Sequence, residues 1–399
     1  MSKKIYITGI GAISAIGNTV SENLFSLKQK KTGIGKITLL DTVYKNEIPV
    51  GEIKQNDKAL RKKLQISEET DYTRTALLGI TAVKEALENA KILDIRKYKT
   101  SIISATTVAG MVASEKYYLD FLNTDFSNEF IKTHEAADHT EKIADFFRIS
   151  EFMTTISTAC SSSANAIMTG TRFIKNGILD RCIVGGADAL SKFTLNGFNT
   201  LMILDREACK PFDNERKGLN LGEAAAYLIL ESEEIVKKEH KNPLAEISGY
   251  ANANDAYHQT ASSPEGYGAG LAMKQALESA KLKPENIDYI NVHGTGTANN
   301  DLSEGRAMLR IFENTIPKFS STKAFTGHTL AAAGSLEAVF SVLSLQNKMV
   351  FPNLRFQNPM QEFDLTPETE LIQNIKIRHI MSNSFGFGGN GTVLIISEA

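Results

Sequence analysis

The chain has 399 residues, of which 42% are hydrophobic and 23% are charged, a composition typical of a globular protein with a large core. Its formal net charge is −2, so no overall field favours nucleic acid or a membrane surface. The three cysteines, Cys160, Cys182 and Cys209, are too few for a disulfide framework and show no CxxC metal spacing, which favours a reducing cytoplasm. No uninterrupted apolar run reaches the roughly 18 residues of a membrane span.

Short β-branched runs alternate with helical patterns along the chain, which predicts an α/β fold with helices covering sheets. The first run, "IYITGIGAI", is broken by Gly9 and Gly11 and indicates a strand and turn, not a signal peptide. Residues 113–148 are richer in charge and lie between two predicted strands, so we expect an insertion that covers one face. Further strands are predicted at 100–108, 152–158, 180–190 and 287–293, and helices at 69–90 and 161–177.

A weak internal repeat divides the chain. "AAAYLILESEE" near the middle resembles "GTVLIISEA" at the end, and both halves begin with a strand that a glycine interrupts. The charged stretch "VKKEHKNP" lies where the two halves would join. We therefore predict two related α/β halves, residues 1–242 and 243–399.

Cys160 lies in "TTISTACSSSANAI", between a predicted strand and a predicted helix. A helix N-terminus lowers the pKa of a thiol and offers backbone N–H groups to a developing oxyanion. Free cysteine is also among the most buried residue types. The stretch by itself therefore leaves both a nucleophile and a buried structural cysteine open.

Two of the seven histidines lie in glycine-containing turns. His293 ends a predicted strand in "NVHGTGTAN", and His328 precedes a helical run in "STKAFTGHTLAAAG". Taken singly, each is as consistent with a structural histidine as with a catalyst. The loop "NSFGFGGNGT" near the end has glycines around Phe387, but it lacks the Lys-Ser/Thr of a phosphate-binding loop and leads into a strand.

In order, these motifs resemble the β-ketoacyl-acyl carrier protein synthases, the elongating condensing enzymes of the thiolase superfamily. The resemblance covers essentially the whole chain and rests on "ITGIGAISAIGNTV", "STACSSSANAI", "KPFDNERKGLNLGEAAA", "DAYHQT", "VHGTGTANNDLSE", "STKAFTGHTLAAAGSLEA" and "NSFGFGG". It implies a thiolase-like fold, in which the two α/β halves form α-β-α-β-α layers. It also implies a decarboxylative Claisen condensation, in which an acyl chain on Cys160 reacts with a malonyl unit on acyl carrier protein. A thiolate suits this role because it is both a good nucleophile and a good leaving group.

The resemblance also implies a role for each matching residue. Cys160 would hold the acyl chain, while His293 and His328 would assist decarboxylation and stabilise the enolate. Lys323 and Glu337 would form a charged pair that organises the histidines. The oxyanion hole would consist of the N–H groups of Cys160 and Phe387, and Phe387 would also act as a gate. The remaining implied positions are Thr260, Thr295 and Thr297 for the phosphopantetheine arm and Val108, Gly110, Met111 and Phe198 for the acyl pocket.

No cofactor or metal is expected beyond the phosphopantetheine of the acyl carrier protein. Because carrier proteins are acidic, we expect a basic docking patch on the surface. The family implies a homodimer, or a heterodimer with an inactive chain-length-factor homologue. The candidate patch residues are Arg61, Lys62, Lys63, Arg74, Arg206 and Lys210.

The sequence departs from the family pattern at four positions. Asn390 and Gly391 stand where Thr-Asn is usual, Lys217 stands where aspartate is common, and Ala331 replaces a common glycine. The segment around residues 197–213 is shorter than in the housekeeping fatty-acid enzymes and resembles the versions from aryl polyene or flexirubin-type pigment pathways. These departures leave the acyl substrate open.

Three other functions compete with this interpretation. A thiolase acting on acyl-CoA would need a second cysteine near the C-terminus, and the late loop has none. A non-catalytic chain-length factor would lack the nucleophile. A papain-like hydrolase would need an Asn or Asp that orients a single histidine, and nothing in the sequence specifies one.

Overall fold

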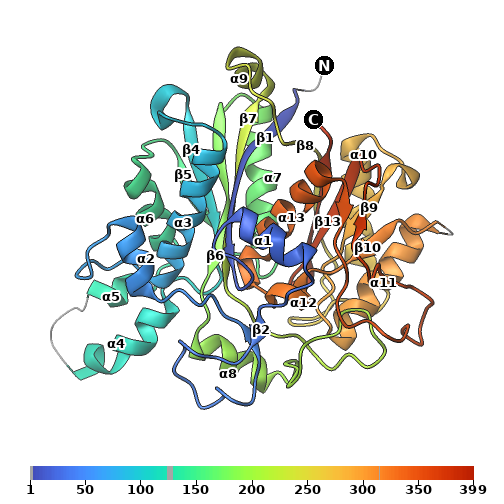
Figure 1. The fold of residues 1–399 in the computed structure, drawn as a ribbon, viewed down its shortest axis with the longest axis horizontal. Helices are drawn as coiled ribbons and strands as arrows, with labels where there is room; N and C mark the ends of the chain where they lie inside the picture. The colour runs from blue at the N-terminus through green and yellow to red at the C-terminus, as the bar shows by residue number, and fades with distance from the viewer. Residues whose placement is uncertain (1–2, 124–128, 314) are drawn as a thin grey trace.

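The computed structural model describes residues 3–123, 129–313 and 315–399, and Figure 1 shows its fold. A mixed sheet of ten strands runs through it in the order β10-β9-β13-β14-β8-β1-β7-β6-β4-β5. β1 and β8 meet at its centre through the antiparallel pairs Tyr6–Glu246 and Ile7–Ala245. The strands are β1 (Ile5–Ser14), β4 (Thr100–Ala105), β5 (Met153–Ile156), β6 (Arg181–Asp188), β7 (Ala224–Ser232), β8 (Ala245–Asn254), β9 (Tyr289–Asn291), β10 (Lys318–Ser320), β13 (His379–Phe385) and β14 (Asn390–Ser397).

The two sides of this sheet repeat one topology. The order β1-β7-β6-β4-β5 corresponds strand by strand to β8-β14-β13-β9-β10, with the same antiparallel and parallel pairings. The weak sequence repeat therefore reflects a repeated arrangement of strands. The domain boundary at residues 242 and 243 stays a prediction.

Helices lie on both faces of each half-sheet. α3 packs on β1 and β7, α10 packs on β8 and β14, and α7 and α13 lie together between the two halves. α13 is buried along almost its whole length because it contacts strands of both halves. The main helices are α3 (Arg74–Asn89), α4 (Met111–Asn123), α6 (Asp138–Phe147), α7 (Ser162–Lys175), α8 (Lys192–Thr200), α10 (Tyr267–Ala280), α11 (Ala298–Phe312), α12 (Lys323–Thr326) and α13 (Ala333–Asn347).

Shorter elements connect these layers. They comprise α1 (Val20–Lys28), β2 (Ile34–Gly35), β3 (Val50–Gly51), α2 (Asp57–Leu64), η1 (Ile95–Lys97), α5 (Glu129–Lys132), α9 (Glu233–Lys238), η2 (Pro284–Asn286), η3 (Leu330–Ala332), β11 (Met349–Val350), β12 (Ile372–Gln373) and η4 (Phe387–Gly389). The described residues include no helix that is long and apolar enough to cross a membrane.

The glycines that interrupt the first strand of each half have a packing role. A Cβ on Gly9 would lie 2.3 Å from the carbonyl oxygen of Ala86 in α3, and one on Gly249 would lie 2.6 Å from that of Ala276 in α10. Both distances are far below van der Waals contact, so only glycine lets each helix lie directly on its strand. The shared glycine of the sequence repeat is thus explained by the same helix–sheet approach in both halves.

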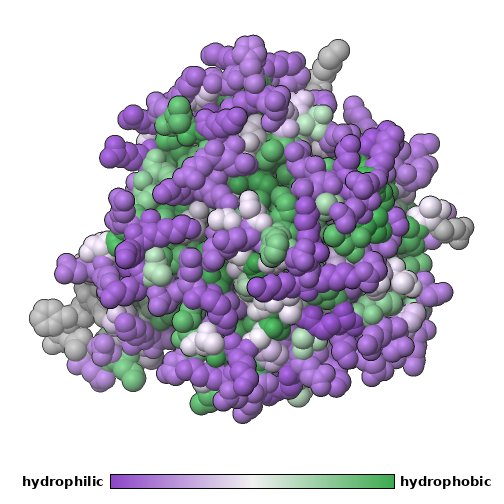
Figure 2. Space-filling model, in the orientation of Figure 1, coloured by the Kyte–Doolittle hydropathy of each residue, from purple (hydrophilic) through white to green (hydrophobic). Residues whose placement is uncertain are grey.

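The segment between β4 and β5 contains α4, α5 and α6, and its role as an insertion that covers one face stays a prediction. α6 packs on β4, β5 and α3, whereas α4 extends at the lower left of Figure 1. Residues 124–128 of this segment lie outside the described residues. Figure 2 shows that hydrophilic residues cover most of the face in view, with hydrophobic residues visible only in scattered areas.

Candidate active site

Cys160 lies in the tight turn between β5 and α7, as the sequence predicts. Ala159 adopts a left-handed conformation with φ of +51°, which is uncommon for a residue with a side chain. The Ser162 hydroxyl secures the turn by accepting the Thr158 N–H at 2.8 Å. The strained turn presents Cys160, only 6% exposed, at the end of a cavity.

His293 follows β9 and is fixed through its backbone and its ring. Its own N–H and that of Gly294 each donate to the Glu304 carboxylate of α11 at 2.8 Å. The Lys323 ammonium donates to the ring Nδ1 at 3.2 Å. An accepting Nδ1 places the proton of the neutral ring on Nε2.

His328 lies between α12 and η3 and reaches the same tautomer by another route. The Leu330 N–H donates to its Nδ1 at 3.1 Å, so its ring proton is also on Nε2. Its own N–H donates to the Asn220 carbonyl at 2.7 Å, and the Gly222 N–H donates to its carbonyl at 2.9 Å. These two bonds attach the His328 turn to the loop that precedes β7.

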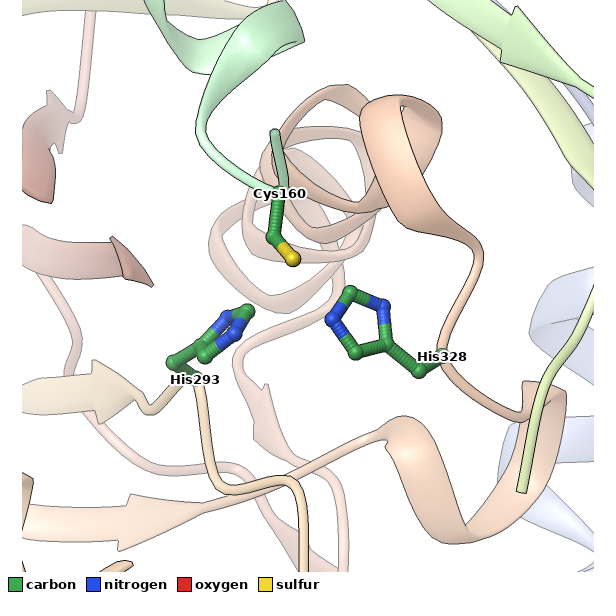
Figure 3. Close-up of side chains that lie close together, drawn as sticks. All are labelled: Cys160, His293 and His328. Atoms are coloured by element: carbon green, nitrogen blue, oxygen red, sulfur yellow. The ribbon is translucent and has the colours of Figure 1, made fainter. Parts of the chain in front are cut away.

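The fold brings Cys160, His293 and His328 together, although 168 positions separate the first from the last. Their sulfur and ring nitrogen atoms lie within 4.8 Å of one another. The imidazole centroids are 5.2 Å apart with the rings nearly perpendicular, and in Figure 3 the sulfur points to the space between them. The thiol and the two imidazoles could offer three ligands to a metal ion, but the nearby Lys323 ammonium would repel a cation at this site.

Burial dominates the electrostatics of this cluster. It raises the pKa of Cys160 to about 11, although the Lys323 charge and the N–H groups of Phe387 and Cys160, which hydrogen-bond the sulfur, act in the opposite direction. The pKa values of His293 and His328 are held well below the usual value, first by burial and then by the Lys323 charge. All three groups are therefore neutral at pH 7. Desolvation thus outweighs the Lys323 charge and the two backbone N–H groups in setting the thiol pKa.

Lys323 and Glu337 form the predicted charged pair, with their side chains only 2% and 3% exposed. The Lys323 ammonium thus bridges the Glu337 carboxylate and His293 Nδ1. Burial raises the pKa of Glu337 to about 7, and Lys323 is the main opposing influence. Removing either partner would leave the other charge without compensation in a buried site.

Two carboxylates that sequence reasoning missed hold the "HGTGT" loop in place. Glu304 accepts the backbone bonds of His293 and Gly294 and a third bond from the Asn383 side chain at 2.9 Å. Asp301 accepts the N–H groups of Thr295 and Phe212 at 2.9 and 2.8 Å. Both belong to "ANNDLSE", where a three-residue spacing places them on one side of α11. This three-residue spacing of Asp301 and Glu304 was the only sequence feature that could have indicated their shared role.

The predicted gate and arm residues lie around one cavity of about 250 Å³ that ends at Cys160. Phe387 stacks on Phe198 of α8 with ring centroids 5.7 Å apart. Thr260, Thr295 and Thr297 also line the cavity. The locations fit the predicted oxyanion hole, gate and arm contacts, and those roles stay predictions.

The other predicted pocket residues lie beside this cavity and are absent from its described lining. Val108 is buried in an apolar cluster on which Met111 and Phe198 pack. A Cβ on Gly110 would lie 2.0 Å from the Thr133 carbonyl oxygen, so this glycine is needed for close packing. Only Phe198 of the four predicted pocket residues lines the cavity. An acyl-binding role for Val108, Gly110 and Met111 stays a prediction.

The expected basic patch needs correction at two positions. The Arg61 guanidinium is buried and donates to the carbonyls of Ser67, Thr70 and Tyr72. Arg74 forms ion pairs with Glu223 and Asp57, and its side chain is only 10% exposed. Neither can contribute to an exposed patch, because these bonds already occupy the guanidinium groups. The status of the remaining candidates differs: Lys62 and Lys63 are exposed, Lys210 is half-buried, and Arg206 pairs with Glu47.

Asn390, one of the departures from the family pattern, connects the loop that carries Phe387 to the turn and helix that follow Cys160. Its side-chain oxygen accepts bonds from Ser161, Asn165 and Asn252 at 2.7, 3.2 and 2.9 Å. Ser161 directly follows Cys160 in the chain. Asn390 therefore fixes the end of the loop that carries Phe387 relative to the turn that carries the thiol.

Two family models match this chain. They are the N-terminal domain of β-ketoacyl synthase, over residues 2–235, and its C-terminal domain, over residues 244–357. The chain therefore belongs to the β-ketoacyl synthase family, and the resemblance seen in the sequence is confirmed.

Curated relatives cover the whole chain. It is 33% identical to "3-oxoacyl-[acyl-carrier-protein] synthase 2" of Staphylococcus aureus strain COL over 100% of this chain and 99% of that protein. It is 32% identical to the protein of the same name from Coxiella burnetii, with 99% of each covered.

Solved structures agree with this assignment. "The ishigamide ketosynthase/chain length factor" superposes with a TM-score of 0.92 at 26% identity and full coverage of both chains. "Ketosynthase (ApeO) in Complex with its Chain Length Factor (ApeC)" from Xenorhabdus doucetiae gives 0.86 at 30% identity, covering 100% of this chain and 98% of that one. The predicted thiolase-like α/β fold is confirmed.

Proposed function

We propose that the protein catalyses a decarboxylative Claisen condensation that extends an acyl chain held on Cys160 with a malonyl unit from acyl carrier protein. The observation that carries this proposal is the buried cluster in which one thiol faces two neutral imidazoles. In both imidazoles Nδ1 accepts a bond, so both offer an Nε2–H donor. Two fixed donors suit an enolate oxygen better than a hydrolytic water.

In the first half-reaction, the Cys160 sulfur attacks the carbonyl carbon of the incoming thioester. The N–H groups of Cys160 and Phe387 hold the carbonyl oxygen as it gains charge. The C–S bond to the phosphopantetheine breaks, and its sulfur leaves with the proton that Cys160 gives up. Because the resting thiol is protonated, this proton must move as the new C–S bond forms.

In the second half-reaction, the malonyl C–C bond breaks and CO₂ leaves with no change in total charge. The electron pair passes to an enolate, whose oxygen accepts the Nε2–H bonds of His293 and His328. The enolate carbon attacks the acyl-Cys160 carbonyl, a C–C bond forms, and Cys160 departs as a thiolate that takes up one proton. Lys323 keeps His293 in the donating tautomer throughout.

Mass spectrometry of the intact protein after incubation with acyl carrier proteins of varied chain length tests the nucleophile. We expect one acyl group per chain, lost in Cys160→Ala and retained in Cys182→Ala and Cys209→Ala, whose thiols are both buried. Absence of acylation at Cys160 by every donor would overturn the proposal. The same series of donors would show the preferred chain length and saturation.

The alternatives predict other outcomes. A thiolase would cleave acetoacetyl-CoA, and it needs a second thiol beside the first, whereas the described cluster contains only Cys160. A chain-length factor would not be acylated. The aryl polyene or flexirubin-type pathway suggested by the sequence would appear as a preference for unsaturated acyl chains.

For partners, we propose acyl carrier protein together with a second subunit, which is another copy of this chain or a chain-length-factor homologue. One similar structure is titled as an acyl-carrier protein in complex with its ketosynthase, and others contain a chain length factor. The free state of all three cysteines fits the cytoplasm predicted from the sequence.

Charge reversal of the exposed Lys62 and Lys63 tests the carrier surface. We expect a higher KM for carrier-bound substrates at low salt and an unchanged KM for small thioesters. An unchanged KM for the carrier would remove these lysines from the interface. Native mass spectrometry would give the subunit composition.

A further inference from the structure

The lining of the Cys160 cavity combines apolar and polar side chains. The apolar ones include Phe198, Met202 and Leu219, and the polar ones include Thr260, Thr295 and Asn299. Cys160 and the two histidines mark the closed end, since all three are buried. Met202, which is 87% exposed, marks the open end.

Lys217 is the single full charge on this lining, within the described part of the chain. No carboxylate of the described residues lines the cavity, and the two histidines are neutral at pH 7. The Lys217 side chain is exposed, and it makes no ion pair or side-chain hydrogen bond with any residue in the described ranges. The cavity therefore has one cation at its rim that no anion of the described chain neutralises.

The backbone that carries Lys217 is well anchored on both sides. The preceding Arg216 donates to the Ala298 carbonyl at 3.3 Å, and the following Gly218 packs so tightly that a Cβ would lie 2.5 Å from the Ile203 carbonyl oxygen. The next residue, Leu219, donates its N–H to the same carbonyl at 2.9 Å. A free ammonium on a fixed backbone is suited to meet a charged group that enters the cavity.

The chemistry of the substrate supplies such a group. A phosphopantetheine arm carries its thioester at one end and a phosphate at the other. When the thioester reaches the buried Cys160, the phosphate at the other end of the arm stays toward the exposed part of the lining, to which the exposed Lys217 belongs. We propose that Lys217 is a substrate-binding residue that pairs with the phosphate of the phosphopantetheine arm, in a position where an aspartate would repel it.

This inference rests on the proposed function, since it assumes that acyl groups arrive on pantetheine. A comparison of acyl-phosphopantetheine with acyl-pantetheine, both without carrier protein, isolates the phosphate. We expect the wild type to acylate Cys160 about threefold to fivefold more efficiently, by kcat/KM, from the phosphorylated donor at low salt. Lys217→Gln should abolish this preference, Lys217→Glu should reverse it, and Lys217→Arg should keep it.

Two controls make the outcome specific. Lys210→Gln removes a nearby positive charge that does not line the cavity, and it should retain the phosphate preference. A salt concentration of about 0.5 M should shrink the preference of the wild type, because an exposed ion pair is screened. Thermal unfolding of each variant should match the wild type, since the Lys217 side chain is exposed.

The results that would overturn the inference differ from those that would overturn the proposed function. Acylation of Cys160 without any phosphate preference, or a preference that survives Lys217→Gln, would refute the role of Lys217 alone. A lack of acylation from both donors and from carrier-bound donors would refute the condensing function itself.

Discussion

Replacement of Lys323 by methionine removes the ammonium that bridges Glu337 and His293 while keeping a side chain of similar length. The side chains of both ion-pair partners are at most 3% exposed, so the methionine thioether is compatible with the site. The Glu337 carboxylate would lose its cation, and its second oxygen already has no partner within the described chain. Breaking a buried pair from one side in this way costs about 3–5 kcal/mol of unfolding free energy.

The cost should depend on pH in a defined direction. Burial already raises the pKa of Glu337 from 4.5 to about 7, and loss of Lys323 removes the main influence that lowers it. A carboxyl group whose pKa is higher in the folded than in the unfolded state destabilises the fold as pH rises between those two values. The deficit of Lys323→Met relative to wild type should therefore be larger at about pH 8 than at about pH 6.

The same substitution should slow decarboxylation much more than it slows acylation of Cys160. Without the Lys323 donor, His293 can carry its proton on Nδ1, and one Nε2–H donor to the enolate is lost. We expect CO₂ release from malonyl carrier protein to fall by about 10²–10³, the usual effect of losing one such donor. Acylation of Cys160, which uses backbone N–H groups, should fall by less than about tenfold.

Denaturant unfolding at both pH values, CO₂ release without an acyl donor, and mass spectrometry of acylation provide the three readouts. Lys318→Met is the matched control, because it breaks a partly exposed pair with Glu368 and should cost about 1 kcal/mol, well below the cost of breaking the buried pair. If folded Lys323→Met protein released CO₂ at the wild-type rate, Lys323 would not control the tautomer of His293. If the loss of unfolding free energy relative to wild type became smaller as pH rises, the effect of Lys323 on the pKa of Glu337 would be refuted.

Three further predictions follow from the site. The raised pKa of Cys160, about 11, predicts slow alkylation by iodoacetamide at pH 7 and a rate that rises about tenfold per pH unit toward pH 10; a plateau near neutrality would contradict it. Glu304→Gln should cost about 2–4 kcal/mol in denaturant unfolding, because one amide oxygen cannot accept three N–H bonds; an unchanged midpoint would argue against that role. In Gly386→Ala, the new Cβ would lie 3.0 Å from the Cys160 nitrogen, so Cys160 acylation should slow about tenfold or more. The control Gly197→Ala, whose Cβ would enter open space on α8, should not slow acylation. Equal acylation rates in the two variants would show that the loop around Gly386 adjusts freely.

The alternation of short β-branched runs with amphipathic segments predicted most strands and helices near the site, because local pattern sets the period of each element. Cys160, His293 and His328 could be selected as candidates from their turns and motif order. Glu304 lies in a motif that the sequence presents, but its structural role could not be predicted. Nothing in the local sequence shows that the backbone N–H groups of His293 and Gly294 would donate to its carboxylate. Arg61 was assigned to the surface because charged residues usually lie there, and the carbonyls that bury it are visible only in the fold.

The sequence by itself determined the family and selected Cys160, His293 and His328 as candidates, because each lies in a motif that spans only a few positions. The tertiary structure decided the protonation states of Cys160 and the two histidines in the site. Desolvation by segments far away in the chain raises the pKa of Cys160, against the Lys323 charge, and keeps both imidazoles neutral. Only the folded chain shows that Lys217 is the lone charge on the cavity lining within the described residues.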